Sequence, residues 1–209
     1  MIILCLMLNK IRESFQHTRP SDDPVSEVMN RLPEHIVKGY LQNIKLKHAG
    51  VLLGLQQSTS GMDLILTKRT TKLKNHAGEI SFPGGSFDQT HDNSIIETAR
   101  REAYEEIGLS QQSSEIIGFV PPQISLGTGF IVTPVIALIT NDFKPVANED
   151  EVEEIFHVPI DFFIDQANLM HEYKIYDQIK WSVYSYTYKQ YYIWGLTAQI
   201  IRKFCSSIQ

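Results

Sequence analysis

Apolar residues recur at three- and four-residue spacing over residues 94–108, which predicts an amphipathic helix. Ser94 followed by Glu97 three positions later forms the pattern of a capping box, and Gly108 stands where a left-handed C-terminal cap is expected. The apolar stripe consists of Ile96, Ala99, Ala103 and Ile107. One face of this helix is therefore expected to lie on a sheet.

Short aliphatic runs on both sides of this helix predict strands. Residues 49–55 and 62–67 are separated by a Ser- and Gly-containing segment, which is typical of a hairpin. Residues 115–120 and 130–139 follow the helix as two further strands. Pro134 indicates an edge position or a bulge in the second of these, because proline cannot donate to a ladder.

The two ends of the chain have different patterns. Residues 9–43 are expected to be helical and peripheral, with a helix start at Asp22-Asp23-Pro24. Residues 161–163 open another helix, and the aromatic and β-branched residues of 173–192 predict a hairpin packed on the domain. The apolar run at residues 1–8 is too short to span a bilayer and lacks the features of a signal peptide.

Composition narrows the class of protein. The 209 residues are 43% hydrophobic and 21% charged, as in a soluble globular protein with one core. The net charge of −5 argues against a nucleic acid as the main partner, while a small anionic substrate stays possible. Cys5 and Cys205 give neither a disulfide framework nor a metal spacing, so the chain is expected in the cytoplasm.

Acidic residues share a second face of the predicted helix. Glu102, Glu105 and Glu106 stand at i, i+3 and i+4, near the end of the helix where its dipole disfavours negative charge. A cation among these carboxylates would relieve the repulsion, and oxygen ligands without cysteine or histidine suit Mg²⁺ or Mn²⁺. Arg101 can pair with Glu105 one turn away. The alternative is a solvated acidic face on a surface helix.

Basic residues gather before the glycine pair Gly84-Gly85. Arg69 and Lys74 are the candidates for phosphate contacts, since cations suit phosphate oxygens, and a solvated basic loop is the alternative. His76 is a candidate acid–base group, although a structural role is the more ordinary one for a single histidine.

Two segments carry a family resemblance. Residues 101–109 read Arg-Glu-Ala-Tyr-Glu-Glu-Ile-Gly-Leu, and this stretch resembles the second half of the Nudix box. Upstream, Leu-Thr-Lys-Arg at residues 66–69, then Gly78 and Phe-Pro-Gly-Gly at residues 82–85 resemble the signature of the coenzyme A diphosphatase branch of the Nudix hydrolases.

The chain departs from this pattern at several positions. Thr70 stands where the branch usually has Ser or Ala, and Lys74 stands where it usually has Arg. The spacer before Arg101 is longer than in the general box, and Asp92 or Asn93 occupies its middle where a glutamate is usual. The spacer therefore does not identify an extra metal ligand.

The resemblance, which covers roughly residues 48–203, implies an α/β fold: a Nudix-type α/β/α sandwich with a mixed sheet between helices. Residues 48–209 would form this domain, and residues 1–47 a helical extension packed on it. The implied reaction is metal-dependent hydrolysis of the pyrophosphate of coenzyme A or acyl-CoA. The alternatives are another nucleoside diphosphate derivative as substrate, such as NADH or ADP-ribose, or a non-catalytic nucleotide-binding module.

The resemblance also implies roles for individual residues. Glu102, Glu105 and Glu106 would form the metal site, with Glu102 and Glu106 as the direct ligands. The residue that activates water is either Glu105, held by Arg101, or Glu151 in the acidic turn of residues 148–154. Glu151 is preferred because a carboxylate beside a divalent ion has a lowered pKa and serves better as a ligand. Arg69, Lys74, Gly84 and Gly85 would contact the substrate. Oligomeric state is left open.

Overall fold

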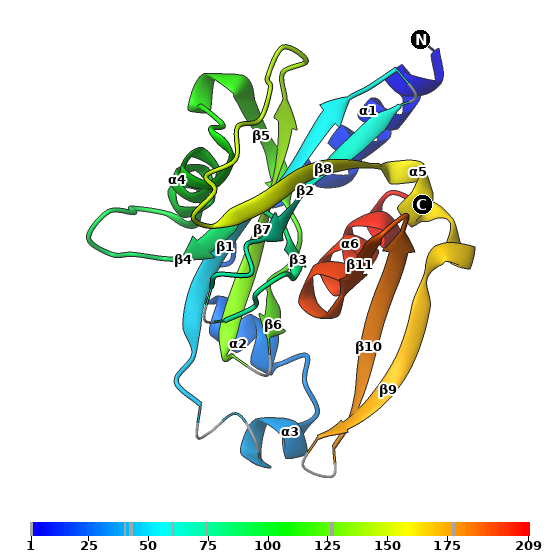
Figure 1. Ribbon diagram of the computed structural model, residues 1–209. Helices are drawn as coiled ribbons and strands as arrows, with labels where there is room; N and C mark the ends of the chain where they lie inside the picture. The colour runs from blue at the N-terminus through cyan, green and yellow to red at the C-terminus, as the bar shows by residue number, and fades with distance from the viewer. Residues whose placement is uncertain are drawn as a thin grey trace.

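The computed structural model describes residues 2–39, 41, 44–59, 61–73, 75–125, 128–176 and 179–209 (Figure 1). Its helices are α1 (Ile2–Phe15), α2 (Pro24–Met29), α3 (Glu34–Gly39), α4 (Ile95–Ile107), α5 (Ile160–Ile164) and α6 (Gly195–Ser207). Its strands are β1 (Lys47–Gln57), β2 (Met62–Arg69), β3 (Ile80–Ser81), β4 (Gly84–Ser86), β5 (Ser114–Phe119), β6 (Gln123–Ser125), β7 (Phe130–Ile139), β8 (Val152–Pro159), β9 (Met170–Tyr176), β10 (Ile179–Tyr188) and β11 (Tyr191–Trp194).

The main sheet is mixed. Its central order is β3-β2-β1-β7-β5, with β4 pairing β1, β6 pairing β7 and β8 pairing β2. β1 and β2 form the predicted antiparallel hairpin, with Leu55 opposite Leu64, whereas β1 and β7 run parallel. The predicted α/β class with a mixed sheet between helices is confirmed.

Helices cover both faces of this sheet, and its central strands therefore bury side chains on both faces. Leu52 of β1 packs in a cluster with Ile65 and the apolar stripe of α4. Leu53, its neighbour in sequence, points to the opposite face and packs in a cluster that includes residues of α1 and α6. A strand buried on both faces reads as a continuous apolar run, as residues 49–55 do.

The prediction for α4 is confirmed at both ends. Ser94 Oγ accepts a hydrogen bond from the backbone N–H of Glu97 at 3.3 Å, and Gly108 has the left-handed φ of 72°. The Glu97 carboxylate returns to the backbone N–H of Asn93 at 2.9 Å, one residue earlier than in the usual capping box.

Pro134 does not mark an edge strand, so that prediction is wrong. β7 lies inside the sheet, with β1 on one side and both β5 and β6 on the other. The carbonyl of Pro134 accepts from Val120 N on the side of β5 and β6, so its missing N–H faces the break between these two short strands. The ladder irregularity lies in β5 between Ile116 and Gly118, not in β7 itself.

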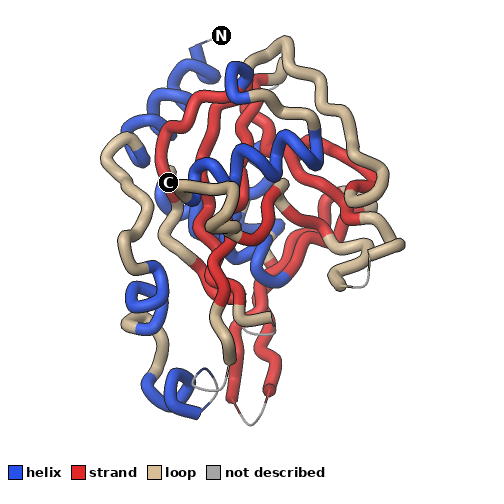
Figure 2. The backbone as a smooth tube through the Cα atoms, turned by 90° about the vertical axis from the view of Figure 1, so that its left-hand side faces the viewer, coloured by secondary structure: helices blue, strands red, loops and turns tan. Residues whose placement is uncertain are grey.

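The N-terminal residues are helical, as predicted. α1, α2 and α3 follow one another down one side of the molecule (Figure 2). Asp23 caps α2 by accepting from Ser26 N at 3.0 Å, with Pro24 in the first turn. The boundary between residues 47 and 48 stays a prediction. Within the described part of the chain, no helix is long and apolar enough to cross a membrane.

The C-terminal aromatic hairpin is confirmed as part of a second, three-stranded sheet of order β11-β10-β9. Tyr186 of β10 is buried against α5, with its ring 5.0 Å from that of Phe163. β11 leads directly into α6 and lies beside β3 of the main sheet (Figure 1).

Ile11 and Phe15 are buried core residues of α1, and Phe15→Ala tests how firmly this helix is held. The Phe15 side chain is 2% exposed and its ring stacks on Phe204 with centroids 5.3 Å apart. We expect Phe15→Ala to lower the free energy of unfolding by about 3–5 kcal/mol in chemical denaturation. Leu6→Ala on the same helix, where Leu6 is 63% exposed, is the control and should change stability by less than about 0.5 kcal/mol. Equal effects of the two variants would contradict this packing.

Candidate active site

The glycine pair brings a strand against the acidic helix. Gly84 and Gly85 lie in β4 and pair with Val51 and Gly50 of β1. A methyl group on Gly85 would lie 2.5 Å from the carboxylate carbon of Glu102, and one on Gly84 would lie 2.5 Å from the carbonyl oxygen of Gly50. Only glycine permits this approach, so the β4 backbone and the Glu102 carboxylate meet directly.

The three glutamates of α4 differ in exposure. The side chain of Glu106 is 2% exposed, that of Glu102 is 16% exposed and that of Glu105 is 49% exposed. Glu102 and Glu106 are one turn apart, so they face the sheet together while Glu105 lies at the rim. The helix therefore presents one buried carboxylate, one half-buried carboxylate and one that reaches solvent.

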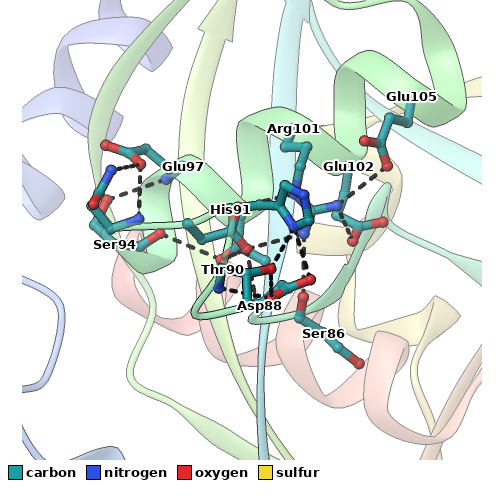
Figure 3. A network of polar contacts seen from close by, with 12 residues as sticks. Ser86, Asp88, Thr90, His91, Ser94, Glu97, Arg101, Glu102 and Glu105 are labelled. Atoms are coloured by element: carbon teal, nitrogen blue, oxygen red, sulfur yellow. Dashed lines mark hydrogen bonds and ion pairs between the residues drawn. The ribbon is translucent and has the colours of Figure 1, made fainter.

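Arg101 is the centre of the polar network on this helix (Figure 3). Its Nη1 donates to Glu102 Oε1 at 2.7 Å and to Glu105 Oε2 at 3.2 Å. The predicted pair of Arg101 with Glu105 is thus present, alongside a shorter one with Glu102. The desolvated Glu102 carboxyl has a raised pKa, which the Arg101 hydrogen bond opposes and the charges of Glu105 and Glu151 reinforce.

Asp92 fixes the other side of the Arg101 guanidinium. Arg101 Nε donates to Asp92 Oδ1 at 2.9 Å, and Nη2 donates to Oδ2 at 3.0 Å. Asp92 also accepts from Thr98 Oγ1 and from Asp88 N, and its side chain is 1% exposed. Sequence reasoning assigned Asp92 no role. The available signal was its position in the spacer where the family usually carries a glutamate.

The Glu106 carboxylate is buried without full compensation. Its Oε1 lies 3.7 Å from Arg69 Nη1, too far for a hydrogen bond, and its Oε2 has no hydrogen-bond partner. Burial raises the pKa of Glu106 to about 8; Arg69 opposes this shift, whereas Glu102 and Glu151 add to it. Near neutral pH, this environment disfavours the carboxylate unless a further positive charge is present.

A divalent cation fits this donor set. Glu102 and Glu106 offer oxygen ligands from adjacent turns of α4. The buried Oε2 of Glu106 has no hydrogen-bond partner, so it is available to a cation. Among the described residues, no group of three or more carboxylate, imidazole or thiol side chains is already gathered in metal-ligand geometry. Arg101 supplies the positive charge next to Glu102 and Glu105 instead.

Glu151 comes to the same site from a distant part of the chain. Its loop is tied to the end of α4 by Asn148 N, which donates to Glu106 O at 3.0 Å. The carbonyl of Glu151 accepts from Thr70 N at 2.9 Å, next to Arg69. The Glu151 charge raises the pKa of both Glu102 and Glu106, as expected for a nearby carboxylate.

The remaining predicted residues are placed as follows. Arg69 ends β2 and faces Glu106, as described above. Lys74 lies outside the described residues. His76 Nδ1 and Glu79 Oε2 are 2.9 Å apart in an exposed pair. The structure thus gathers Arg69, Gly84, Gly85, the three glutamates of α4 and Glu151 around one end of α4.

Comparison with known proteins identifies the family. The NUDIX domain family model matches residues 46–179. The chain is 42% identical over 149 residues to a protein of Pectobacterium atrosepticum called "Uncharacterized Nudix hydrolase NudL", covering 69% of this chain and 74% of that protein. A Shigella sonnei protein of the same name is 35% identical over 205 residues, covering 97% of this chain and 95% of its own.

Solved structures support the fold. A Caenorhabditis elegans Ap4A hydrolase in a binary complex matches with a TM-score of 0.51 at 15% identity, covering 77% of this chain and 96% of that chain. Another structure of a C. elegans Ap4A hydrolase matches with a TM-score of 0.50 at 14% identity, over 79% and 100% of the two chains. At these identities the likeness concerns the fold alone.

Fold and site together define an enzyme of the pyrophosphate-cleaving class, built on a mixed sheet with a carboxylate-rich helix. The chain belongs to the Nudix hydrolase family, whose members hydrolyse pyrophosphate bonds and generally use divalent metal ions.

The burial of Glu106 predicts a pH-dependent loss of stability in protein kept metal-free with EDTA. Its folded pKa of about 8 lies above the ordinary 4.5, so the folded state binds more protons than the unfolded state between these values, and stability falls as pH rises through this window. Glu106→Gln removes the effect. We expect the free energy of unfolding of the variant, minus that of wild type, to increase by about 1–3 kcal/mol between about pH 5 and about pH 8.

Denaturant titrations across this pH range measure the difference. Glu105→Gln is the control, because the Glu105 side chain is half exposed and should show no comparable growth. Parallel stability curves for wild type and Glu106→Gln would show that Glu106 is not held in the environment described.

Proposed function

We propose that the protein hydrolyses the pyrophosphate bond of coenzyme A or an acyl-CoA. The products are 4′-phosphopantetheine, or its acyl form, and adenosine 3′,5′-bisphosphate. The motif that resembles the coenzyme A branch supports this choice, and one structural observation carries it. Residues 66–69 and 82–85, which are separate in sequence, end at two carboxylates one turn apart on α4: Arg69 beside Glu106, and Gly85 against Glu102.

A position for the diphosphate follows from these contacts. The Arg69 side chain is 24% exposed at the end of β2, so its guanidinium can donate to a phosphate oxygen there. Gly84 and Gly85 are half-buried and let the β4 backbone lie directly against the Glu102 carboxylate, so a ligand that reaches this carboxylate would also meet that backbone. Lys74 is the second proposed phosphate contact.

Glu102 and Glu106 are the proposed ligands of a divalent ion, Mg²⁺ or Mn²⁺, with Glu105 at the rim of the same site. When bound, such an ion would neutralise charge on the diphosphate oxygens and lower the pKa of a bound water. Arg101, fixed by Asp92, holds Glu102 and Glu105 in place. The protein side chains thereby keep the carboxylates in position before the substrate arrives.

Glu151 is the proposed general base. It is half-buried, it lies near both Glu102 and Glu106, and its loop is held by the end of α4 and by Thr70. Glu105 is more exposed, and its carboxylate accepts a hydrogen bond from the Arg101 guanidinium. A base must reach the attacking water, and Glu151 lies near Glu102 and Glu106, the two carboxylates proposed to hold the metal.

A dinucleotide polyphosphate is the second candidate substrate. NADH and ADP-ribose are further candidates, because each contains a pyrophosphate between two nucleoside-like halves. A non-catalytic module is disfavoured because nucleotide binding alone does not require Arg101 and all three glutamates of α4.

A substrate panel with Mg²⁺ tests the proposed activity. We expect the highest kcat/KM for coenzyme A, with 4′-phosphopantetheine and adenosine 3′,5′-bisphosphate as products identified by mass. Removing the 3′-phosphate of coenzyme A should lower kcat/KM by about tenfold or more, the cost of one charge-assisted hydrogen bond. Glu106→Gln is the control and should lose turnover by orders of magnitude. Preferred hydrolysis of ADP-ribose, NADH or diadenosine tetraphosphate would assign the enzyme to another substrate.

The identity of the base is tested by comparing Glu151→Gln with Glu105→Gln. We expect Glu151→Gln to lower kcat by about 10²–10⁴-fold and to remove the acidic limb of the pH–rate profile, because that limb reports the protonation of the base. Metal affinity, measured by Mn²⁺ titration, should change little in Glu151→Gln and fall in Glu105→Gln. Unchanged turnover with an intact acidic limb in Glu151→Gln would exclude Glu151 as the base.

A further inference from the structure

A pocket of about 290 Å³ lies where the small sheet meets the main sheet, away from α4. Its lining residues are Lys68, Ala77, Gly78, Glu79, Ile80, Glu154, Gln190, Tyr191, Tyr192 and Trp194. β11 and β3, which border it, lie side by side in Figure 1. Its volume is at the lower end of the range for small-molecule sites, roughly 300–1,000 Å³, so it suits one ring system rather than a whole dinucleotide.

One wall of this pocket is aromatic. Tyr192 and Trp194 are 54% and 38% exposed, while Tyr191 and Ile193, the residues that alternate with them, are buried. This alternation sets Tyr192 and Trp194 on the face of β11 that turns away from the core. Lys174 Nζ lies 5.5 Å from the Trp194 ring centroid, so a cation already accompanies the ring. Exposed aromatic rings beside cations are a stacking surface for a nucleic base.

Other residues that line the pocket are polar. Glu154 Oε1 accepts from the Tyr191 hydroxyl at 2.5 Å, and a carboxylate can accept further hydrogen bonds. Glu79 adds a second carboxylate, and Lys68, paired with Glu153 at 2.5 Å, adds the ammonium. Two carboxylates against one ammonium disfavour a purely anionic ligand. They favour a planar ring that donates hydrogen bonds, with its anionic substituent near the lysine.

The pocket is joined to the active site through β2. Lys68 lines the pocket, and Arg69, the next residue, faces Glu106. The pocket residues Gly78 and Glu79 bond the backbone of Arg69: Gly78 N donates to Arg69 O, and Arg69 N donates to Glu79 O. A ligand whose diphosphate binds at Arg69 can therefore extend into this pocket, because the next residue along β2, Lys68, lines it.

We propose that this pocket is the subsite for the amino-substituted purine of the substrate, with the base stacked on Trp194 and Tyr192 and its exocyclic amino group donating to Glu154 or Glu79. The inference rests on the proposed function, since it assigns the nucleoside half of that substrate. It makes β11 a specificity element, although β11 lies outside the residues that carry the family's catalytic motif.

The binding test uses the fluorescence of Trp194 in metal-free protein. The chain has two tryptophans, so Trp181→Phe leaves Trp194 as the single emitter. We expect adenosine 3′,5′-bisphosphate to quench it saturably, and 4′-phosphopantetheine not to do so. If Trp181→Phe does not fold, the fluorescence of wild type minus that of Trp194→Phe reports the quenching of Trp194 instead. Quenching by 4′-phosphopantetheine alone, or by neither compound, overturns the assignment.

The kinetic test compares Trp194→Ala with Tyr173→Ala. Tyr173 is also an exposed aromatic residue of the small sheet, 57% exposed, but it does not line the pocket. We expect Trp194→Ala to raise KM for coenzyme A about tenfold with kcat within about twofold, the size of one lost base stack, and Tyr173→Ala to change neither. Equal behaviour of the two variants overturns the subsite.

The two proposals fail separately. Nucleotide quenching of Trp194 in a protein that does not cleave coenzyme A would retain the base subsite and reject the proposed substrate. Cleavage of coenzyme A with no quenching, and with an unchanged KM in Trp194→Ala, would retain the substrate and reject the subsite.

Discussion

The burial of the Glu106 carboxylate is the constraint on which the active site depends. A carboxylate removed from water needs a positive charge or several hydrogen bonds, and Arg69 at 3.7 Å supplies only part of this requirement. The unpartnered Oε2 and the raised pKa are consequences of the same burial. The protein thus accepts a locally unfavourable charge, as is common where a metal or a substrate is to be bound. A divalent ion is the natural complement to this arrangement.

Arg101 offsets the repulsion among the three carboxylates of α4 and fixes the positions of two of them. Three carboxylates within two turns repel one another, yet a single guanidinium bonds two of them directly. Asp92 fixes the orientation of that guanidinium through two parallel hydrogen bonds, and its buried side chain is itself held by Thr98. The spacer before the helix is therefore part of the site, because it carries the residue that orients the arginine.

β2 connects the catalytic end of the molecule to the pocket of the small sheet. Arg69 and Lys68 are adjacent on this strand, at the irregularity where its register with β8 shifts. Arg69 lies beside Glu106 of α4, and Lys68 lines the pocket that β11 borders. The same strand can in this way serve two halves of one substrate: the diphosphate beside Arg69 and the ring beside Trp194.

The sequence alone determined the parts that depend on local spacing. The limits of α4, its apolar stripe and its acidic face follow from capping residues and helical periodicity, and the β1–β2 hairpin follows from two aliphatic runs. Only the tertiary structure decided what depends on contacts between distant segments: Asp92 on Arg101, Glu151 near Glu106, Pro134 inside the sheet, and the meeting of β11 with β3. These contacts are set by how strands pair and loops return, and the spacing of residues along one chain carries little information about either.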